Sequence, residues 1–287
     1  MKSRVPSLAA RPFRGLHSGS PVLGRMGSME TRLARSAHEI QSAQRLRYTV
    51  FYEELGAEAD GRTRLHKRDE DGLDRYCDHL LVLDTNLPEH QQIVGTYRLM
   101  DQAAASASGS YYSQSEFNLA PMLSADADKR YLELGRSCIA PAYRSRRTIE
   151  LMWQGIWSIV LERKIDTLFG CASFTGVDVA EHKEAFSWLE SHALVESGMD
   201  CPAAASNHFS LTEFRMEAAG DAKRSARAFA SLPPLLKGYL RLGAKMASEA
   251  VIDDNFGTID VLVVLDVAQI SEKYIAHYGT DASRFAA

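Results

Sequence analysis

Two apolar runs in the first half of the chain place the strongest constraint on its fold. Residues 79–84 (HLLVLD) and 92–100 (QIVGTYRLM) have the length and composition of β-strands, and Asn86-Leu87-Pro88 lies between them. Strands joined by so short a connection pair antiparallel, because a parallel pair needs a crossover of a dozen or more residues. The pattern therefore excludes a doubly wound, purely parallel sheet.

The rest of the chain alternates between strand and helix patterns. Further strands are expected at 29–34, 131–139, 167–172 and 259–265, and helices over 36–51, 148–160, 181–190 and 269–277. Ser36 and Thr148 are expected to cap the first two helices, and Gly56 to end the first. Residues 58–78 are too polar to be expected in the core. This order predicts an α/β fold whose mixed central β-sheet is flanked by helices on both faces.

Composition narrows the class of protein. The 287 residues suffice for one globular domain, and a net charge of −4 argues against nucleic-acid binding through overall charge. No segment approaches the roughly 20 consecutive apolar residues that span a bilayer. The cysteines form no CxxC pair, so we expect reduced thiols in a cytoplasmic protein. They are Cys77, Cys138, Cys171 and Cys201.

The N-terminal residues 1–27 differ from the remainder. They contain five basic residues, no acidic residue and no apolar core of the kind a secretory signal needs. We predict a disordered basic tail here, and a folded domain over 28–287 with a C-terminal helical and strand extension from about 201 to 287. Electrostatic contact with an anionic membrane surface is the alternative role for the tail.

A second candidate for membrane contact lies near the C-terminus. In the segment 235–246 (LLKGYLRLGAKM), Lys237, Arg241 and Lys245 follow one another at helical spacing, with apolar residues on the other faces. An ordinary amphipathic helix that covers the sheet explains the same pattern.

Catalytic motifs of the common kinds are absent. The sequence has no GxSxG, GxxxxGK[ST], GxGxxG or HExxH, and no two histidines stand at metal-ligand spacing, so we expect no metal site. What remains is a set of charges inside apolar strand-like runs: Arg98, Glu133 and Arg136. Such charges are unfavourable unless they are paired or used in function.

Glu133 and Arg136 allow two interpretations. They pair with each other or alternate onto a solvated face, or a β-bulge at Gly135 brings both to one face and turns a backbone N–H outward. The second arrangement is one that acyl transfer can use.

Two other charged sets have similar alternatives. Taken one by one, Arg47, Asp71 and Asp74 are each interpreted as solvated charges on the surface; taken together, they form a charged cluster. A basic turn at the start of a helix is either solvated or an anion site suited to phosphate. That turn comprises Arg144, Arg146 and Arg147.

Taken in order, these clusters resemble known motifs. The segments LRYTVFYEELG (46–56), DGLD (71–74), VGTYRL (94–99) and LELGR (132–136) resemble the motifs of the acyl-homoserine-lactone synthases, which have a GNAT-like acyltransferase fold. Longer segments, among them CDHLLVLD, LELGRSCI, GCASF, LPPLLKGYLRLG and VIDDNFGTIDV, resemble the bacterial L-ornithine Nα-acyltransferases of ornithine lipid synthesis. Ala57 and Gly135 depart from the lactone synthases, which usually carry Trp and Ser there.

The resemblance implies a GNAT-like domain that moves a 3-hydroxyacyl group from acyl carrier protein to the α-amine of L-ornithine, giving lyso-ornithine lipid. No permanently bound cofactor is implied, because the donor is carried on phosphopantetheine. The alternatives are an acyl-homoserine-lactone synthase, another long-chain amino-acid N-acyltransferase, or a non-enzymatic module that docks acyl carriers or membranes. Peripheral contact with the inner membrane would suit a lipid product.

The resemblance also implies roles for individual residues. Glu133 matches the position of a general base, with Arg136 beside it in the catalytic strand. The expected substrate-cleft residues are Arg47, Asp71, Asp74 and Arg98, and the expected donor-phosphate residues are Arg144, Arg146 and Arg147. The carboxylates that bind the side chain of a dibasic acceptor stay open among Asp71, Asp74, Glu249, Asp253 and Asp254.

Overall fold

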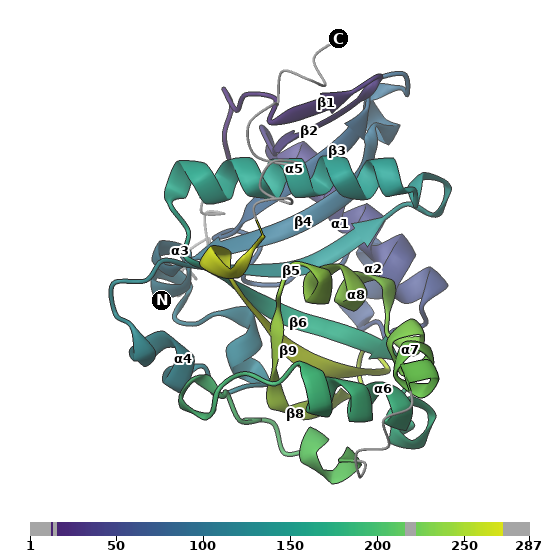
Figure 1. Cartoon of the computed structure of the whole chain (residues 1–287). Helices are drawn as coiled ribbons and strands as arrows, with labels where there is room; N and C mark the ends of the chain where they lie inside the picture. The colour runs from purple at the N-terminus through teal and green to yellow at the C-terminus, as the bar shows by residue number, and fades with distance from the viewer. Residues whose placement is uncertain (1–12, 14–15, 216–221, 272–287) are drawn as a thin grey trace, which may run out of the picture.

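The computed structural model describes residues 13, 16–215 and 222–271, and the described part is built on a nine-stranded sheet (Figure 1). The strand order is β1-β2-β3-β4-β5-β6-β9-β8-β7. All neighbouring strands pair antiparallel except β5 and β6, which pair parallel. The prediction of a mixed α/β sheet is confirmed.

The strands are β1 (Gly24–Met26), β2 (Met29–Leu33), β3 (Asp78–Asp84), β4 (Ile93–Asp101), β5 (Tyr131–Ile139), β6 (Thr167–Thr175), β7 (His208–Ser210), β8 (Lys245–Asp253) and β9 (Thr258–Asp266). The helices are α1 (Ala37–Tyr48), α2 (Gly61–His66), α3 (Gln102–Ser108), α4 (Ala120–Ala125), α5 (Arg146–Arg163), α6 (Val179–His192), α7 (Ala222–Ser231) and α8 (Pro234–Arg241). A π-helical turn, η1 (Thr49–Glu54), continues α1, and a 3-10 turn, η3 (Tyr112–Ser115), precedes β5.

Helices cover both faces of the sheet. In Figure 1, α5 runs in front of the N-terminal strands and packs against β1, β2 and β3, whereas α1 lies behind and packs against β4 and β5. Gly155 allows the close approach of α5, because a Cβ at this position would lie 2.8 Å from Thr31 Oγ1 and 2.9 Å from Leu80 Cδ1. Burial of Leu151 and Ile156 against these strands stabilises the layer, at roughly 1.5–3 kcal/mol for each fully buried aliphatic side chain.

The parallel pair opens a gap in the sheet. Of the described pairing between β5 and β6, only Tyr131–Glu133 against Thr167–Phe169 is in register. Gly170 follows at once with φ +154°, and a Cβ there would lie 2.2 Å from the Leu134 carbonyl oxygen. Only glycine lets the strands approach so closely at the point where they diverge.

Most sequence-based boundaries agree with the structure. The hairpin of β3 and β4 is present, β5 has the expected bounds, and Ser36 caps α1 by accepting a hydrogen bond from the Glu39 N–H. The second cap was assigned wrongly. Ser145, not Thr148, caps α5, and its side chain accepts from the Thr148 N–H.

Three further expectations need correction. Gly24–Met26 lies within the predicted tail of residues 1–27 but forms strand β1, so regular structure begins before residue 28. The basic helix of 235–246 ends at Arg241, and Lys245 begins β8, so Lys245 does not extend the basic row. The helix expected over 269–277 lies mostly outside the described residues.

No helix within the described ranges has both the length and the apolar character needed to cross a bilayer.

Candidate active site

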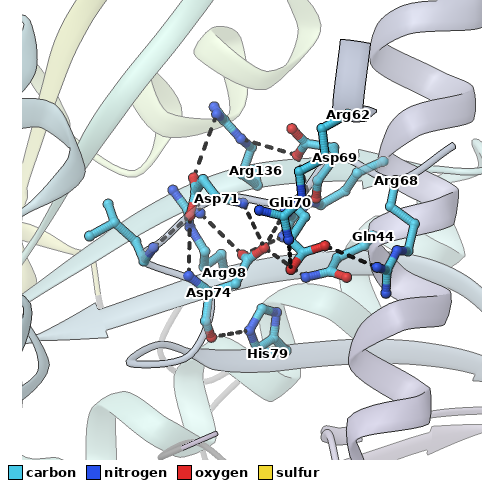
Figure 2. Close-up of polar contacts among 12 residues, drawn as sticks. Gln44, Arg62, Arg68, Asp69, Glu70, Asp71, Asp74, His79, Arg98 and Arg136 are labelled. Carbon is cyan, nitrogen blue, oxygen red and sulfur yellow. Dashed lines mark hydrogen bonds and ion pairs between the residues drawn. The ribbon is translucent and has the colours of Figure 1, made fainter. Parts of the chain in front are cut away.

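A buried network of charges links α1, the segment before β3, and β4. The Arg47 guanidinium donates to Asp69 Oδ2 at 2.7 Å and to both carboxylate oxygens of Asp74 at 2.9 Å, and it also donates to the Asp69 carbonyl oxygen. Arg98 donates to Asp71 Oδ2 at 2.6 Å and to Asp74 Oδ1 at 3.2 Å (Figure 2). The expectation that residues 58–78 stay out of the core is therefore wrong for Asp69 and Asp74, which are buried.

The network balances charge internally. Burial raises the pKa of Asp74, but the charges of Arg47 and Arg98 outweigh this and hold the pKa well below its usual range. The neighbouring His79 imidazole, which contacts the Asp74 carbonyl oxygen at 2.8 Å, has its pKa lowered by burial.

Most of the network lies beneath the surface. Arg47 and Asp74 are 1% exposed and Arg98 is 3% exposed. These three side chains hold residues 69–74 against the sheet, and the expectation that they bind substrate stays a prediction. Asp71 is more exposed and reaches toward a third arginine.

That third arginine is Arg136. Its Nε lies 3.2 Å from Asp69 Oδ2, one Nη lies 3.9 Å from Asp71 Oδ2, and its Cζ lies 4.7 Å from the ring centres of both Tyr112 and Phe256. Ion pairs and cation–π contacts thus fix the guanidinium at the edge of the network.

A β-bulge places Arg136. The register between β4 and β5 passes from Thr96↔Cys138 to Arg98↔Gly135, so β5 contains one extra residue. The predicted bulge is present, but the left-handed residue is Arg136 (φ +50°), not Gly135. A non-glycine residue in this conformation costs about 1–3 kcal/mol, and the contacts of its side chain offset that strain.

The divergence of β5 and β6 forms a pocket of about 230 Å³. One part of its wall is apolar and aromatic, contributed by Phe51, Leu55, Tyr97, Leu235 and Phe256. Another part is polar, contributed by Ser113, Glu133, Arg136, Cys171 and Asp260. An apolar cavity with a few convergent polar groups is the usual form of a small-molecule site.

Glu133 lines this pocket and is 3% exposed. Its carboxylate accepts hydrogen bonds from the Tyr112 N–H (2.9 Å), the Ser113 N–H (2.7 Å) and the Ser113 hydroxyl (2.5 Å). In the described ion pairs, Arg136 pairs with Asp69 and Asp71 rather than with Glu133. Pairing of Glu133 with Arg136 is therefore wrong, while the bulge brings both to one pocket.

The three arginines at the start of α5 lie apart. Arg144 makes a bidentate contact with the Glu54 carboxylate, at 2.5 and 2.7 Å, in the turn whose neighbours Phe51 and Leu55 line the pocket. Arg146 donates to Glu150 along the helix, and the Arg147 guanidinium lies against the β1–β2 turn at Gly27. The structure thus brings Arg144 near the pocket and directs the other two elsewhere.

The pocket also contains residues that sequence reasoning missed. Cys171 was assigned no role, yet it lines the wall and its thiol donates to Ser113 Oγ at 3.4 Å. Desolvation and the nearby Glu116 and Asp260 carboxylates raise its pKa well above the usual range. A thiol held in the protonated state is a poor nucleophile, so Cys171 is unsuited to carry an acyl group.

A cluster of carboxylates adjoins this wall. Glu116, Asp253 and Asp260 each present a carboxylate oxygen within 4.8 Å of the others. The expectation of no metal site rests on the spacing of the histidines, whereas these three carboxylates are a group that could hold a metal ion. Asp260 carries the same sequence signal as Glu133, a charge inside an apolar strand, whereas Glu116 carries none.

Comparison with known proteins gives this geometry a context. Residues 46–154 match the family described as acetyltransferase (GNAT) domain. Two proteins named L-ornithine N(alpha)-acyltransferase are similar over almost the whole chain. The one from Rhizobium meliloti (strain 1021) is 47% identical over 93% of this chain and 89% of its own, and the one from Brucella abortus (strain 2308) is 46% identical over 92% and 93%.

A more distant relative of the same name, from Rhodobacter capsulatus, is 36% identical over 88% of this chain and 95% of its own. The GNAT match includes Arg47, the Asp69–Asp74 segment and Arg98, which build the network. It also includes η1 and the bulge of β5, which line part of the pocket. The sheet, the pocket and the relatives together support an acyltransferase activity. The chain belongs to the L-ornithine N(alpha)-acyltransferase family.

Proposed function

We propose that this enzyme transfers a 3-hydroxyacyl group from the phosphopantetheine thioester of acyl carrier protein to the α-amine of L-ornithine, giving lyso-ornithine lipid. The observation that carries the proposal is the position of Glu133 and Arg136 in one pocket, at the point where β5 and β6 diverge. The acceptor is inferred from the names of the relatives.

The reaction needs a neutral amine next to the thioester. The amine nitrogen attacks the carbonyl carbon, a C–N bond forms, the C–S bond breaks, and the amine proton leaves while the pantetheine sulfur departs as a thiol. An α-amine with a pKa near 8 is mostly protonated at pH 7, and neutralising it costs about 1–1.5 kcal/mol. Glu133 is the proposed acceptor of the proton, directly or through water.

The surroundings of Glu133 suit that role. Its three donors from η3 fix the carboxylate and occupy three of about four acceptor positions, and Oε2, which accepts a single hydrogen bond, keeps room for one more. The larger contribution is alignment, because holding two reactants in register is worth roughly 7–11 kcal/mol.

The bulge of β5 is the proposed oxyanion site. On β5 the bulge leaves Arg136 and Ser137 without register partners on β4, and a Cβ at the adjacent Gly135 would have no described heavy atom within 4 Å. A backbone N–H at such a bulge can donate to the developing negative charge on the thioester oxygen. Arg136 adds positive charge at the same edge.

The donor is proposed to approach from the start of α5. Arg144 is 42% exposed in its side chain and lies beside the turn whose residues line the pocket, so an anionic phosphopantetheine arm can compete for it with Glu54. Arg146 and Arg147 face other directions and are proposed to meet the acidic surface of the carrier protein.

Peripheral contact with the inner membrane, by a cytoplasmic enzyme, is a further part of the proposal. Its support is α8, where Lys237 and Arg241 stand one turn apart and the exposed Leu235 borders the pocket. Sedimentation with anionic and with neutral lipid vesicles measures this contact.

The test is the mass of the product formed from purified enzyme, a defined 3-hydroxyacyl carrier protein and L-ornithine. We expect Nα-acylornithine, and we expect Glu133→Gln to lower kcat by about 10²–10⁴-fold. Glu53→Gln, which changes a half-exposed carboxylate outside the pocket, is the matched control. Acylation of S-adenosylmethionine but not of ornithine would identify a lactone synthase, and a Glu133→Gln enzyme with normal kcat would remove Glu133 as the base.

A further inference from the structure

The carboxylates of Glu116, Asp253 and Asp260 form a cluster that is separate from the buried network of aspartates and arginines. Glu116 is 6% exposed and Asp260 is 5% exposed, and the three side chains place oxygens within 4.8 Å of one another. Within the described residues, none of the three forms an ion pair with a lysine or arginine.

Two oxygens of the cluster have unused capacity. Glu116 Oε2 and Asp260 Oδ1 are buried and accept no hydrogen bond from the described residues. Asp253 is partly satisfied, because its Oδ1 accepts from the Asn255 and Phe256 N–H groups at 2.9 and 3.1 Å. Glu116 has a hydrogen-bond contact with Cys171, and Asp260 has contacts with Ser173 and Thr258. The two remaining oxygens are buried without a donor, which is unfavourable, and a cation that enters the cluster relieves that cost.

The cluster opens on the reaction pocket. Asp260 lines the same cavity as Glu133, and the turn that begins at Asp253 carries Phe256, which packs on Arg136. A short path also connects the two sides: Ser113 donates to Glu133 and accepts from the Cys171 thiol, whose surroundings include Glu116 and Asp260.

The pKa values of the two buried acids reflect their burial and the shortage of positive charge around them. Burial, followed by the charge of Asp260, raises the pKa of Glu116, and burial likewise raises the pKa of Asp260. The nearby Arg136 lowers both but does not compensate them, since its guanidinium is held by Asp69 and Asp71.

We propose that Glu116, Asp253 and Asp260 bind the side-chain ammonium of the acceptor, so that this cluster selects a dibasic amino acid while its α-amine faces Glu133. This inference rests on the proposed function. A primary ammonium has three N–H donors and no acceptor, which matches three convergent carboxylates with unused lone pairs. Mg²⁺ is the competing cation, but it keeps several waters and demands near-octahedral geometry, whereas the cluster offers one oxygen from each of three side chains.

The experiment compares two acceptors that differ in the distal ammonium. We measure the acylation rates of the wild type, Glu116→Gln and Asp260→Asn with ornithine and with norvaline. Norvaline keeps the side-chain carbons of ornithine but lacks the side-chain amine. We expect each substitution to lower kcat/KM for ornithine at least about 10-fold, mainly through KM, and to leave norvaline within about 3-fold. The ornithine-to-norvaline ratio falls accordingly.

Asp254→Asn is the matched control. Asp254 is adjacent to Asp253 in sequence but exposed, and it contacts Asn207 at 3.2 Å outside the cluster. Its substitution leaves the ratio unchanged. Thermal unfolding with and without ornithine gives a second readout, in which ornithine raises the Tm of the wild type more than that of Glu116→Gln.

The outcomes separate the two proposals. If the wild type acylates ornithine and neither Glu116→Gln nor Asp260→Asn changes the ratio, the cluster does not select the acceptor and the proposed function stands. If Mg²⁺ stabilises the metal-free enzyme and chelation abolishes turnover with both acceptors, the cluster is a metal site and the inference is overturned. If the wild type does not acylate ornithine at all, the proposed function fails.

Discussion

The substitution Asp74→Asn probes the buried network through its most connected carboxylate. Asp74 Oδ1 accepts from Arg47 at 2.9 Å and from Arg98 at 3.2 Å, while Oδ2 accepts from Arg47 and from the Gln44 amide, both at 2.9 Å. Asparagine has the same shape, but whichever way its amide is turned, the NH₂ group faces two donors. The change therefore removes a charge and creates donor–donor contacts in a site that is 1% exposed.

The magnitude follows from these contacts. Removing one partner of a buried ion pair costs about 3–5 kcal/mol, because the remaining charge stays buried without compensation. Here two arginines lose a partner, but Arg47 keeps Asp69 and Arg98 keeps Asp71. We therefore expect a loss of about 3–5 kcal/mol in the free energy of unfolding, a large part of the roughly 5–15 kcal/mol typical of a native protein.

The assay is urea unfolding followed by circular dichroism at several pH values, with Glu53→Gln as the control. Glu53 pairs with Lys67 at 3.3 Å, and their side chains are 44% and 70% exposed, so its loss is expected to cost less than about 1 kcal/mol. A change of the same size in both variants would mean that the buried network does not stabilise the fold as its geometry indicates.

The pH dependence gives the sign of the effect. The arginines hold the pKa of Asp74 below its ordinary value, so its contribution to stability is fully present above the unfolded-state pKa of about 3.9. That contribution is lost as the pH falls through the acid range. The difference in the free energy of unfolding between wild type and Asp74→Asn is therefore constant from pH 7 to about 5 and narrows below about 4. A difference that stays constant down to pH 3 would refute the reasoning.

Two further predictions concern the divergence of β5 and β6. Gly170→Ala places a Cβ 2.2 Å from the Leu134 carbonyl oxygen at φ +154°, so we expect a loss of about 1–3 kcal/mol or more in urea unfolding, and an unchanged stability would show that the strands can separate there at no cost. Cys171→Ala should keep kcat within about 3-fold in a thiol-release assay, because the raised pKa of Cys171 keeps it protonated; a loss of 10²-fold or more would indicate a covalent acyl-enzyme.

The sheet could be predicted from sequence because its strands are apolar runs bounded by turn residues. The hairpin of β3 and β4 follows from Asn86-Leu87-Pro88, and β5 was placed with its observed bounds. The bulge could be predicted from Gly135, but the residue that adopts the left-handed conformation could not. Arg136 takes that role because Asp69, Tyr112 and Phe256 hold its side chain, and those contacts come from three separate segments.

Burial of the polar segment 58–78 was the least predictable feature. Hydrophobic periodicity predicts the average solvent exposure of a segment. It cannot predict that a carboxylate is buried together with an arginine that balances its charge. Asp69 and Asp74 are buried because Arg47, more than twenty residues earlier, is buried with them. The resemblance named Asp74 and Arg47 as cleft residues, but the order of motifs along a chain does not tell how deeply a side chain is buried.

The two groups of buried acids differ in whether their carboxylates have positively charged partners. This difference narrows the choice, left open by the sequence, of the protein carboxylates that bind the side chain of the acceptor amino acid. Asp69, Asp71 and Asp74 face Arg47, Arg98 and Arg136, so their charges are balanced within the network and little field remains to attract a cation. Asp71 and Asp74 are thereby disfavoured as ligands of an ammonium.

Of the remaining candidates, Asp253 is the one favoured as a ligand of an ammonium. Asp253 belongs to a cluster with Glu116 and Asp260 that has unpaired oxygens beside the pocket. Glu249, in contrast, accepts a hydrogen bond from the Ala203 N–H at 2.6 Å, and Asp254 is exposed. Under the proposal that the cluster binds the side-chain ammonium, Arg136 in the same cavity is the group suited to bind the carboxylate of the dibasic amino acid. The same proposal has the α-amine, attached to the same carbon as the carboxylate, face Glu133. A substitution in the network should therefore change how Arg136 is held, and a substitution in the cluster should change which amine is chosen.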